Sequence, residues 1–283
     1  MANTTSTNPT LTRDQVEAIL VLPLTQASTY MSAGFPVFVS NGEPIKVPSL
    51  QSMGTAGYVA EGAQIPQVSA STNEIELLAS TVHAVKIITR VSRELMRQSV
   101  VNIENTFSTK MVSDVSRILD EALWNGAGTG GAPLGLAKFT GITSAGTAGG
   151  TVTANLLYEM QELALDENID FPQARWAMSP KNLTRIRKLA DSTGQKFLAP
   201  SLAAGAPATL LGNAYTVTNH LPDDLILFFD PAQVAIGMDD RASISLLDQT
   251  YADYDEIGIR VTARYDTKAL NPKAIVKLSG LTA

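Results

Sequence analysis

The most regular hydrophobic pattern in the chain lies between residues 103 and 125. Apolar side chains recur there in steps of four, at Ile103, Phe107, Met111, Val115, Leu119 and Leu123. This spacing predicts an amphipathic α-helix of about 22 residues, which would be about 33 Å long at 1.5 Å per residue. The pattern ends at Asn125, and a glycine-rich stretch from Gly126 to Gly135 follows. We therefore predict that the helix stops where this stretch begins.

Alternating apolar and polar residues predict a strand over residues 82–91. Val85, Ile87 and Val91 fall on one face of this strand, whereas Lys86 and Arg90 fall on the other, which is the pattern of a half-buried strand. Further strands are predicted at 175–178, 214–218, 225–229, 234–238, 242–247, 257–264 and 274–278.

Two shorter helices are predicted in the second half of the chain. One is amphipathic and runs from about Leu156 to Ala164, and the other starts at Ser179-Pro180, where serine suits the N-cap and proline the first helical position. The Gly- and Thr-rich segment 141–151 is predicted to be a connector. Because strands and helices are interleaved without strict βαβ alternation, the predicted fold class is α+β.

Residues 41–73 differ sharply from their surroundings in composition. These 33 residues contain four Gly, three Pro, four Ser and four Ala, but only three charged residues, Glu43, Lys46 and Glu61. Strand signals at both ends, 45–47 and 75–77, predict a long hairpin that projects from the body. Since such a segment cannot build its own core, we expect neighbouring chains to supply the missing burial.

The overall composition favours a folded protein with extensive protein contacts. Of the 283 residues, 45% are hydrophobic and 17% are charged, whereas an average soluble domain has about 25% charged residues. Weakly charged surface is less costly to desolvate at a contact. The net charge is −6, and the densest basic cluster is only Arg185, Arg187 and Lys188. Sequence-specific DNA binding is therefore disfavoured.

Several classes of site and location are excluded by what the sequence lacks. It has no cysteine and two histidines, His83 and His220, which excludes disulfides, thiolate zinc sites, cysteine nucleophiles and a three-histidine metal site. No window approaches 18 consecutive apolar residues, and the N-terminus lacks a secretory pattern. We expect a soluble, cytosolic chain with no membrane partner, no metal and no cofactor.

The glycine-rich stretch 126–135 is also a candidate phosphate-binding loop. Such loops connect a strand to a following helix and usually bring a Lys-Ser/Thr pair, whereas this stretch follows a helix and brings neither. A helix-terminating turn is the preferred interpretation. A soluble phosphate-binding enzyme is the weakest of the functional alternatives.

Other polar and aromatic residues have simple structural interpretations. The acidic groups at Asp223-Asp224, Asp239-Asp240 and Asp253 to Glu256 lack the spacing of a calcium loop, so they are predicted to be solvated turn residues. A catalytic histidine would need a partner serine, but no Gly-x-Ser-x-Gly motif occurs. Trp124 and Trp176 have apolar neighbours and are predicted to pack in the core. We therefore predict no catalytic residue and no enzyme activity.

A series of short segments spans residues 55–278. They are Tyr58 to Pro66, Val91 to Leu95, Asp120 to Gly126, Pro133 to Gly135, Trp176 to Pro180, Leu211 to Val217, Phe229 to Pro231, Arg260 to Asp266 and Asn271 to Leu278. No single segment is specific. Their order and spacing, however, resemble the major capsid proteins of tailed bacteriophages that have the Hong Kong 97-type shell fold.

The resemblance implies a division of the chain into four parts. They are an N-terminal arm (1–36), an extended E-loop hairpin (37–80), a peripheral domain with a long spine helix (81–128 and 234–269) and an axial domain (129–233 and 270–283). The chain would form hexamers and pentamers that close an icosahedral shell around double-stranded DNA, bound without sequence specificity. An encapsulin-like nanocompartment shell is the alternative within the same fold.

The resemblance also implies contacts and partners. The expected intersubunit contacts involve hairpin residues Lys46, Tyr58, Glu61 and Ile65. The shell would assemble in the host cytoplasm and become part of the virion, with scaffolding, portal and decoration proteins as further candidate partners. Many members of this family carry a long removable N-terminal segment that guides assembly, whereas this chain has only the short arm before the hairpin. We therefore expect a separate scaffolding protein or assembly without one, because Met1 argues against a processed product.

Some capsid proteins of this type cross-link an E-loop lysine to an asparagine of a neighbouring peripheral domain. Lys46 is the only lysine before residue 86 and thus the only candidate donor in the hairpin. The corresponding partner loop, 248–256, contains no asparagine, and Gln249 has a longer side chain that would alter the required geometry. We therefore expect non-covalent contacts to hold the shell.

Overall fold

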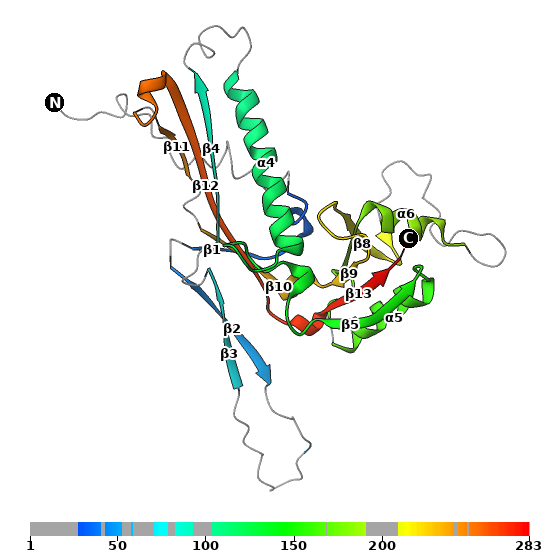
Figure 1. The fold of residues 1–283 in the computed structure, drawn as a ribbon. Helices are drawn as coiled ribbons and strands as arrows, with labels where there is room; N and C mark the ends of the chain where they lie inside the picture. The colour runs from blue at the N-terminus through cyan, green and yellow to red at the C-terminus, as the bar shows by residue number, and fades with distance from the viewer. Residues whose placement is uncertain are drawn as a thin grey trace.

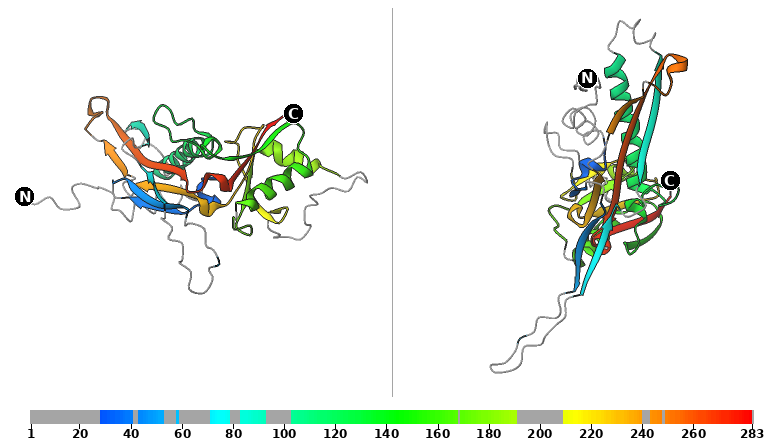
Figure 2. Two further views of the ribbon diagram at one scale, coloured as in Figure 1. Left: turned by 90° about the horizontal axis from the view of Figure 1, so that it is seen from below. Right: turned by 90° about the vertical axis from the view of Figure 1, so that its left-hand side faces the viewer.

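Two lobes and a projecting hairpin make up the described part of the chain (Figure 1). The computed structural model describes residues 28–40, 43–52, 58, 71–78, 83–92, 103–167, 169–190, 209–239, 243–247 and 249–282. A long lobe contains a five-stranded sheet and a long helix, and a compact lobe contains a six-stranded sheet and two shorter helices. The right-hand view of Figure 2 shows that the hairpin and the long helix extend in opposite directions.

The long helix, α4 (Ile103–Asn125), confirms the predicted apolar stripe. Met111, Val115, Leu119 and Leu123 are all buried. At the end of the helix, the N–H of Gly126 donates to the carbonyl of Ala122 at 2.8 Å. A Cβ atom at Gly126 would lie 2.3 Å from that oxygen and 2.3 Å from the carbonyl oxygen of Pro133. The helix therefore ends at a position that only glycine can occupy, as the glycine-rich stretch predicted.

The five-stranded sheet of the long lobe is built around one long strand, β12 (Glu256–Ala269). β4 (Ala84–Ser92), β10 (Val234–Asp239) and β11 (Ser243–Leu247) pair with it antiparallel, and β1 (Val37–Ser40) adds to β10 in parallel. Val85 and Ile87 of β4 pack against the core, whereas Lys86, Ile88 and Arg90 are exposed. This alternation confirms the predicted half-buried strand.

The compact lobe is a six-stranded mixed sheet with two helices on one face. The strand order is β5 (Thr143–Gly150), β13 (Ile275–Leu281), β9 (Ile226–Phe229), β6 (Arg175–Met178), β8 (Asn213–Val217) and β7 (Thr209–Leu210). Helix α5 (Ala154–Asp166) begins at the N-cap Thr153, and α6 (Pro180–Lys188) begins at the N-cap Ser179 with proline in its first turn. The N-cap at Ser179 confirms the sequence prediction.

The hairpin consists of β2 (Ile45–Ser52) and β3 (Ser71–Leu77), paired antiparallel. Ile45 lies opposite Leu77, and Val47 lies opposite Ile75. The two predicted strand ends therefore pair with each other, and the hairpin stands away from both lobes (Figure 1). Residues 53–57 and 59–70, between the two strands, lie outside the described residues.

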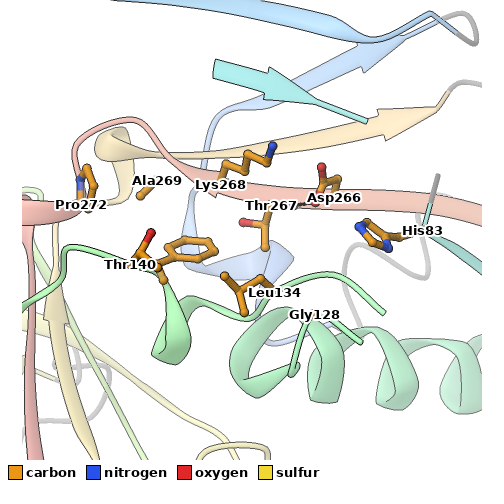
Figure 3. A pocket seen from close by; sticks show the side chains of 10 residues that line it. His83, Gly128, Leu134, Thr140, Asp266, Thr267, Lys268, Ala269 and Pro272 are labelled. Atoms are coloured by element: carbon orange, nitrogen blue, oxygen red, sulfur yellow. Dashed lines mark hydrogen bonds between the residues drawn. The ribbon is translucent and has the colours of Figure 1, made fainter. Parts of the chain in front are cut away.

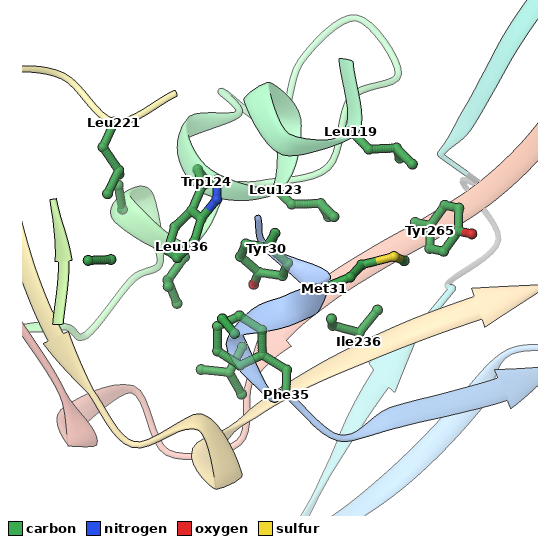
Figure 4. Packing of buried hydrophobic residues seen from close by; sticks show 14 of the residues in the cluster. Tyr30, Met31, Phe35, Leu119, Leu123, Trp124, Leu136, Leu221, Ile236 and Tyr265 are labelled. Atoms are coloured by element: carbon green, nitrogen blue, oxygen red, sulfur yellow. The ribbon is translucent and has the colours of Figure 1, made fainter. Parts of the chain in front are cut away.

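Two hydrophobic cores meet at the compact sheet, because successive residues of a strand face opposite sides. Leu227 and Phe229 of β9 face the first core, between the sheets and α4, whereas Ile226 and Phe228 face the second core, under α5 and α6. Aromatic rings fill the first core: Tyr30, Phe35 and Trp124 contact one another (Figure 4), and Phe229 contacts Phe35 and Trp124. Trp124 and Trp176 are both fully buried, which confirms their predicted packing role.

Short 3₁₀-helices connect the main elements. They are η2 (Met31–Ala33), η3 (Leu136–Lys138), η4 (Pro231–Gln233), η5 (Ala252–Tyr254) and η6 (Pro272–Ala274). The side chains of Asp230 and Asn271 cap η4 and η6 by accepting hydrogen bonds from backbone N–H groups two residues on.

Three sequence predictions need correction. Segment 143–150, predicted to be a connector, is strand β5, because it pairs in parallel with the buried strand β13. The strand predicted at 257–264 continues to Ala269, because its second half pairs with β10. Asp239, predicted to be a solvated turn residue, is buried at the end of β10, where its Oδ2 accepts a hydrogen bond from Arg264 Nη1 at 2.7 Å.

Candidate assembly surfaces

The hairpin carries an exposed cluster of three charged side chains. Lys46 Nζ lies 3.1 Å from Glu74 Oε2 and 3.8 Å from Glu76 Oε1. The hydrogen bond to Glu74 and the negative charges of both glutamates raise the pKa of Lys46 above its ordinary value. Because solvent screens exposed ion pairs, this cluster contributes little to the stability of a single chain. Its charges are available to a partner surface.

The structure describes two of the four predicted contact residues. Lys46 lies on β2, and Tyr58 is fully exposed. Glu61 and Ile65 lie outside the described residues. The role of all four in contacts between chains stays a prediction.

The base of the hairpin is anchored firmly to the long lobe. Leu77 and Leu78 are buried, and the N–H of Leu78 donates to Asp266 Oδ2 at 3.0 Å. Gly237 of β10 lies beneath them, since a Cβ atom there would approach Leu77 Cβ to 3.1 Å. The hairpin therefore touches the body at its base and leaves it in a defined direction.

A buried carboxylate fixes the point where the N-terminal segment enters the body. Asp120, on α4, accepts hydrogen bonds from Ser28 Oγ (2.5 Å), Thr29 N (2.8 Å), Thr29 Oγ1 (2.8 Å) and Tyr30 N (3.2 Å). Asp120 is only 3% exposed. Hydrogen bonds to a charged acceptor are stronger than neutral ones. Sequence reasoning did not find this anchor, because Asp120 is about ninety residues away from its partners.

The same segment connects the two lobes. Trp124 Nε1 donates to Thr29 Oγ1 at 3.1 Å, and Thr29 Oγ1 contacts Thr218 Oγ1 of the compact lobe at 3.3 Å. The Tyr30 hydroxyl lies 2.6 Å from Thr267 Oγ1 of β12, and burial raises the pKa of Tyr30 above its ordinary range. Residues 28–35 thus form a wedge between α4, β12 and the compact lobe (Figure 4).

The face of the five-stranded sheet that points away from α4 is open and cationic. Ile88 is 50% exposed there, between exposed Lys86 and Arg90 of the same strand. The guanidinium of Arg90 lies 4.1 Å from the centre of the Tyr251 ring, which is a favourable cation–π geometry.

The described residues offer little that resembles an active site. A cleft of about 330 Å³ lies beside β12 (Figure 3). It is lined by Gly128 and Leu134 of the glycine-rich stretch, by residues 266–269 of β12, and by His83, Phe139, Thr140 and Pro272. His83 lies at its edge and contacts the carbonyl of Gly131 through Nδ1 at 3.0 Å. Within the described residues, no three His, Asp or Glu side chains are grouped so that they could hold a metal ion.

The comparison with protein families shows to which family the chain belongs. The sequence profile of the phage capsid family matches residues 11–280. The chain belongs to the phage capsid family. Members of this family are structural proteins of the capsid rather than enzymes. The chain is also 24% identical, over 263 aligned residues, to a major capsid protein of Klebsiella oxytoca phage phiKO2. The alignment covers 84% of this chain and 60% of the phiKO2 protein, so this chain spans less than two thirds of the length of that relative.

Solved structures share the fold of this capsid-family chain. A capsid chain of the native GTA particle has a TM-score of 0.73 at 19% identity, with 90% of each chain covered. A chain of Microbacterium phage Oxtober96 has a TM-score of 0.71 at 16% identity, covering 90% of this chain and 91% of that one. A virus-like particle from Pyrococcus furiosus has a TM-score of 0.59 at 12% identity, covering 94% and 98%. In the described part of the chain, no helix is long and apolar enough to cross a membrane.

Proposed function

We propose that this chain is the major capsid protein of a phage-type icosahedral head, which it builds from hexamers and pentamers around double-stranded DNA. The observation that carries the proposal is the β2–β3 hairpin, whose described strands stand away from both lobes beyond their buried base and carry an exposed charged cluster. Fixing a chain segment in one conformation costs conformational entropy, which a segment that buries little surface does not offset. A neighbouring chain supplies the missing burial when copies assemble.

The described elements also support a finer division of the fold. α4 and the five-stranded sheet correspond to a peripheral domain with a spine helix (81–128 and 234–269), and the compact lobe corresponds to an axial domain (129–233 and 270–283). The hairpin corresponds to an E-loop (37–80), preceded by an N-terminal arm (1–36). In this division, strand β1 joins the long lobe through its pairing with β10.

Family membership and the relatives support the proposed assembly. The GTA capsid, whose fold this chain shares, was described with C5 symmetry, and the phiKO2 relative is a major capsid protein. We propose that the shell assembles in the host cytoplasm and becomes the virion capsid, with scaffolding, portal and decoration proteins as partners. DNA contact in such a shell is not sequence-specific.

Sedimentation velocity and electron microscopy of the purified chain test the proposal. We expect rings or closed shells, with or without a crowding agent or an added scaffold. A chain that sediments only as a monomer of its own mass at micromolar concentration under all these conditions would contradict self-assembly. Particles isolated from an infected host should contain DNA, whereas particles filled with enzyme would favour the nanocompartment alternative.

A deletion of Gly54 to Pro66 tests the role of the hairpin. We expect the deleted chain to keep its circular dichroism spectrum and its thermal melt, because the two cores lie in the lobes. We also expect it to form no closed shells, because the tip would contact a neighbouring chain. Normal particles from the deleted chain would refute the hairpin's role, and a chain that no longer folds would show that the tip belongs to the body.

A further inference from the structure

The two helices of the compact lobe carry opposite charges. α5 contains three acidic residues, Glu159, Glu162 and Asp166, and no basic residue. α6 contains Lys181, Arg185, Arg187 and Lys188 and no acidic residue. All three carboxylates of α5 are exposed, as are Lys181, Arg187 and Lys188 of α6. Each helix therefore presents a single sign of charge to solvent.

In the described part of the chain, the carboxylates of α5 are not paired with a countercharge. Among the described residues, no ion pair joins Glu159, Glu162 or Asp166 to another side chain. They lie three and four residues apart on one face, so they repel each other in an isolated chain. Tyr158 and Leu165 on the same face are 52% and 47% exposed. The outer face of α5 is thus an acidic surface with two uncovered apolar side chains.

The cations of α6 are only partly engaged. Lys181 Nζ pairs with Asp223 Oδ2 at 2.5 Å, and this hydrogen bond lowers the pKa of Asp223 below its ordinary value. Arg187 Nη2 donates to the neutral hydroxyl of Tyr215 at 3.3 Å. Lys188, in the last turn, has no ion pair with any described residue. Arg187 and Lys188 are therefore available to an acidic partner.

The two helices cover different parts of the same sheet. α5 packs on β5, β13 and β9, at one end of the strand order. α6 follows β6 directly and reaches Tyr215 of β8, toward the other end. Both helices lie on one face, since Met160 of α5 and Ile186 of α6 belong to the same core (Figure 1). The acidic and basic surfaces therefore lie toward opposite ends of one sheet.

We propose that α5 of one copy packs against α6 of the next copy, head to tail, around the axis of each ring. The partner that fits the acidic α5 surface is a second copy of this chain, because its α6 surface is basic. The alkyl stems of Arg187 and Lys188 can cover Tyr158 while their charges reach Glu159 and Glu162. A head-to-tail contact between different surfaces generates a closed ring when the rotation closes. This inference rests on the proposed function, since it names a contact within the proposed hexamers and pentamers.

Paired charge reversals test the contact. One variant reverses α5 (Glu159→Lys with Glu162→Lys), and the other reverses α6 (Arg187→Glu with Lys188→Glu). We expect each variant alone to raise the concentration needed for assembly by about tenfold or more, because two attractions become repulsions. The neutral variant Glu159→Gln with Glu162→Gln should lie between the α5 reversal and the wild type. Circular dichroism should show that all of these chains remain folded, since every changed side chain is exposed.

Restoration of assembly distinguishes this contact from a general loss of stability. A chain that carries both reversals should regain wild-type assembly, because its α5 is then basic and its α6 acidic. An equimolar mixture of the two single-helix variants should form rings in which the variants alternate. Alternation closes only around an even number of copies, so the mixture should give six-membered rings and no five-membered ones, as seen by electron microscopy.

Each outcome separates this inference from the proposed function. If the wild type assembles and either reversal leaves assembly unchanged, or if the chain with both reversals does not recover, the α5–α6 contact is refuted while the capsid function stands. If the wild type forms no rings or shells under any condition, the proposed function itself fails. Recovery in the combined chain, together with six-membered rings in the mixture, would establish the contact.

Discussion

Replacement of Asp120 by asparagine should weaken the junction between the N-terminal segment and the two lobes. The carboxylate accepts four hydrogen bonds, two from backbone N–H groups and two from hydroxyls, and it is buried on α4. An asparagine keeps one acceptor oxygen and turns an NH₂ group toward the remaining donors. One backbone N–H, of either Thr29 or Tyr30, is then left without a partner in a buried site.

The expected loss of stability follows from these contacts. A hydrogen bond to a charged group contributes about 1.5–3 kcal/mol, and an unsatisfied buried donor costs about 1–3 kcal/mol. Because one pair of bonds survives, we expect Asp120→Asn to lower the free energy of unfolding by about 2–4 kcal/mol. Asp120→Ala removes every acceptor and should cost more. These are large fractions of the total stability of a typical domain, which is about 5–15 kcal/mol.

Urea unfolding of the unassembled chain measures this effect. Tryptophan fluorescence is a suitable signal, because Trp124 donates a hydrogen bond to Thr29 and lies inside the affected junction. Asp114→Asn is the matched control, since Asp114 lies on the same helix and, among the described residues, forms an ion pair with Lys110 at 2.8 Å. The control should change the stability by less than about 0.5 kcal/mol. If Asp120→Asn also stays within about 0.5 kcal/mol of the wild type, the Asp120 hydrogen bonds do not hold the junction.

Three further predictions address the helix end, a buried tyrosine and the hairpin lysine. Gly126→Ala should destabilise the fold by about 3 kcal/mol or more in urea unfolding, because its Cβ would lie 2.3 Å from two carbonyl oxygens; Gly130→Ala, with nothing within 4 Å but a positive φ, should cost less. Burial raises the pKa of Tyr265 to about 12, so the stability that the neutral hydroxyl contributes is complete below pH 10. It is lost as the pH rises through 12, by about 2.3 kcal/mol at pH 12 and by about 2.7 kcal/mol in the limit above it. Tyr265→Phe should therefore flatten the fall in stability over this window, and an unchanged slope would contradict the assignment. Boiled particles should give a single monomer band on a denaturing gel, whereas a ladder that disappears in Lys46→Ala would reveal a covalent cross-link.

The segment 28–35, which forms the junction between the two lobes, also affects how copies of the chain meet. This segment contacts α4, β12 and the compact lobe at once, so it sets the angle between the lobes. The cationic sheet face lies on the long lobe, and the charged helices lie on the compact lobe. A change at the junction would therefore alter how surfaces on the two lobes meet neighbouring chains, even though no contact residue is changed.

Local patterns determined the elements whose burial follows from sequence periodicity. The four-residue stripe of α4, the alternation along β4 and the Ser179-Pro180 start of α6 were all readable, because helix and strand periods place every side chain on a face. The projecting hairpin was also readable, because a segment so poor in large apolar residues cannot form a core. The order of segments along the chain indicated the capsid fold, which the family comparison confirms.

Only the tertiary structure decided the features that depend on partners far away in sequence. β5 has no apolar alternation and is a strand because the buried β13 lies beside it. Asp239 has an acidic neighbour in sequence but an arginine neighbour in space, so it is buried rather than solvated. In the sequence, Asp120 looks like any other polar residue of a helix. Its role as an anchor comes from the hydroxyl and N–H donors of Ser28, Thr29 and Tyr30, which the fold places beside it. Sequence periodicity assigns a residue to a face, whereas the segment that covers that face depends on how distant parts of the chain pack. The junction at Asp120 and the placement of the acidic α5 and the basic α6 on one face of a sheet both depend on that packing.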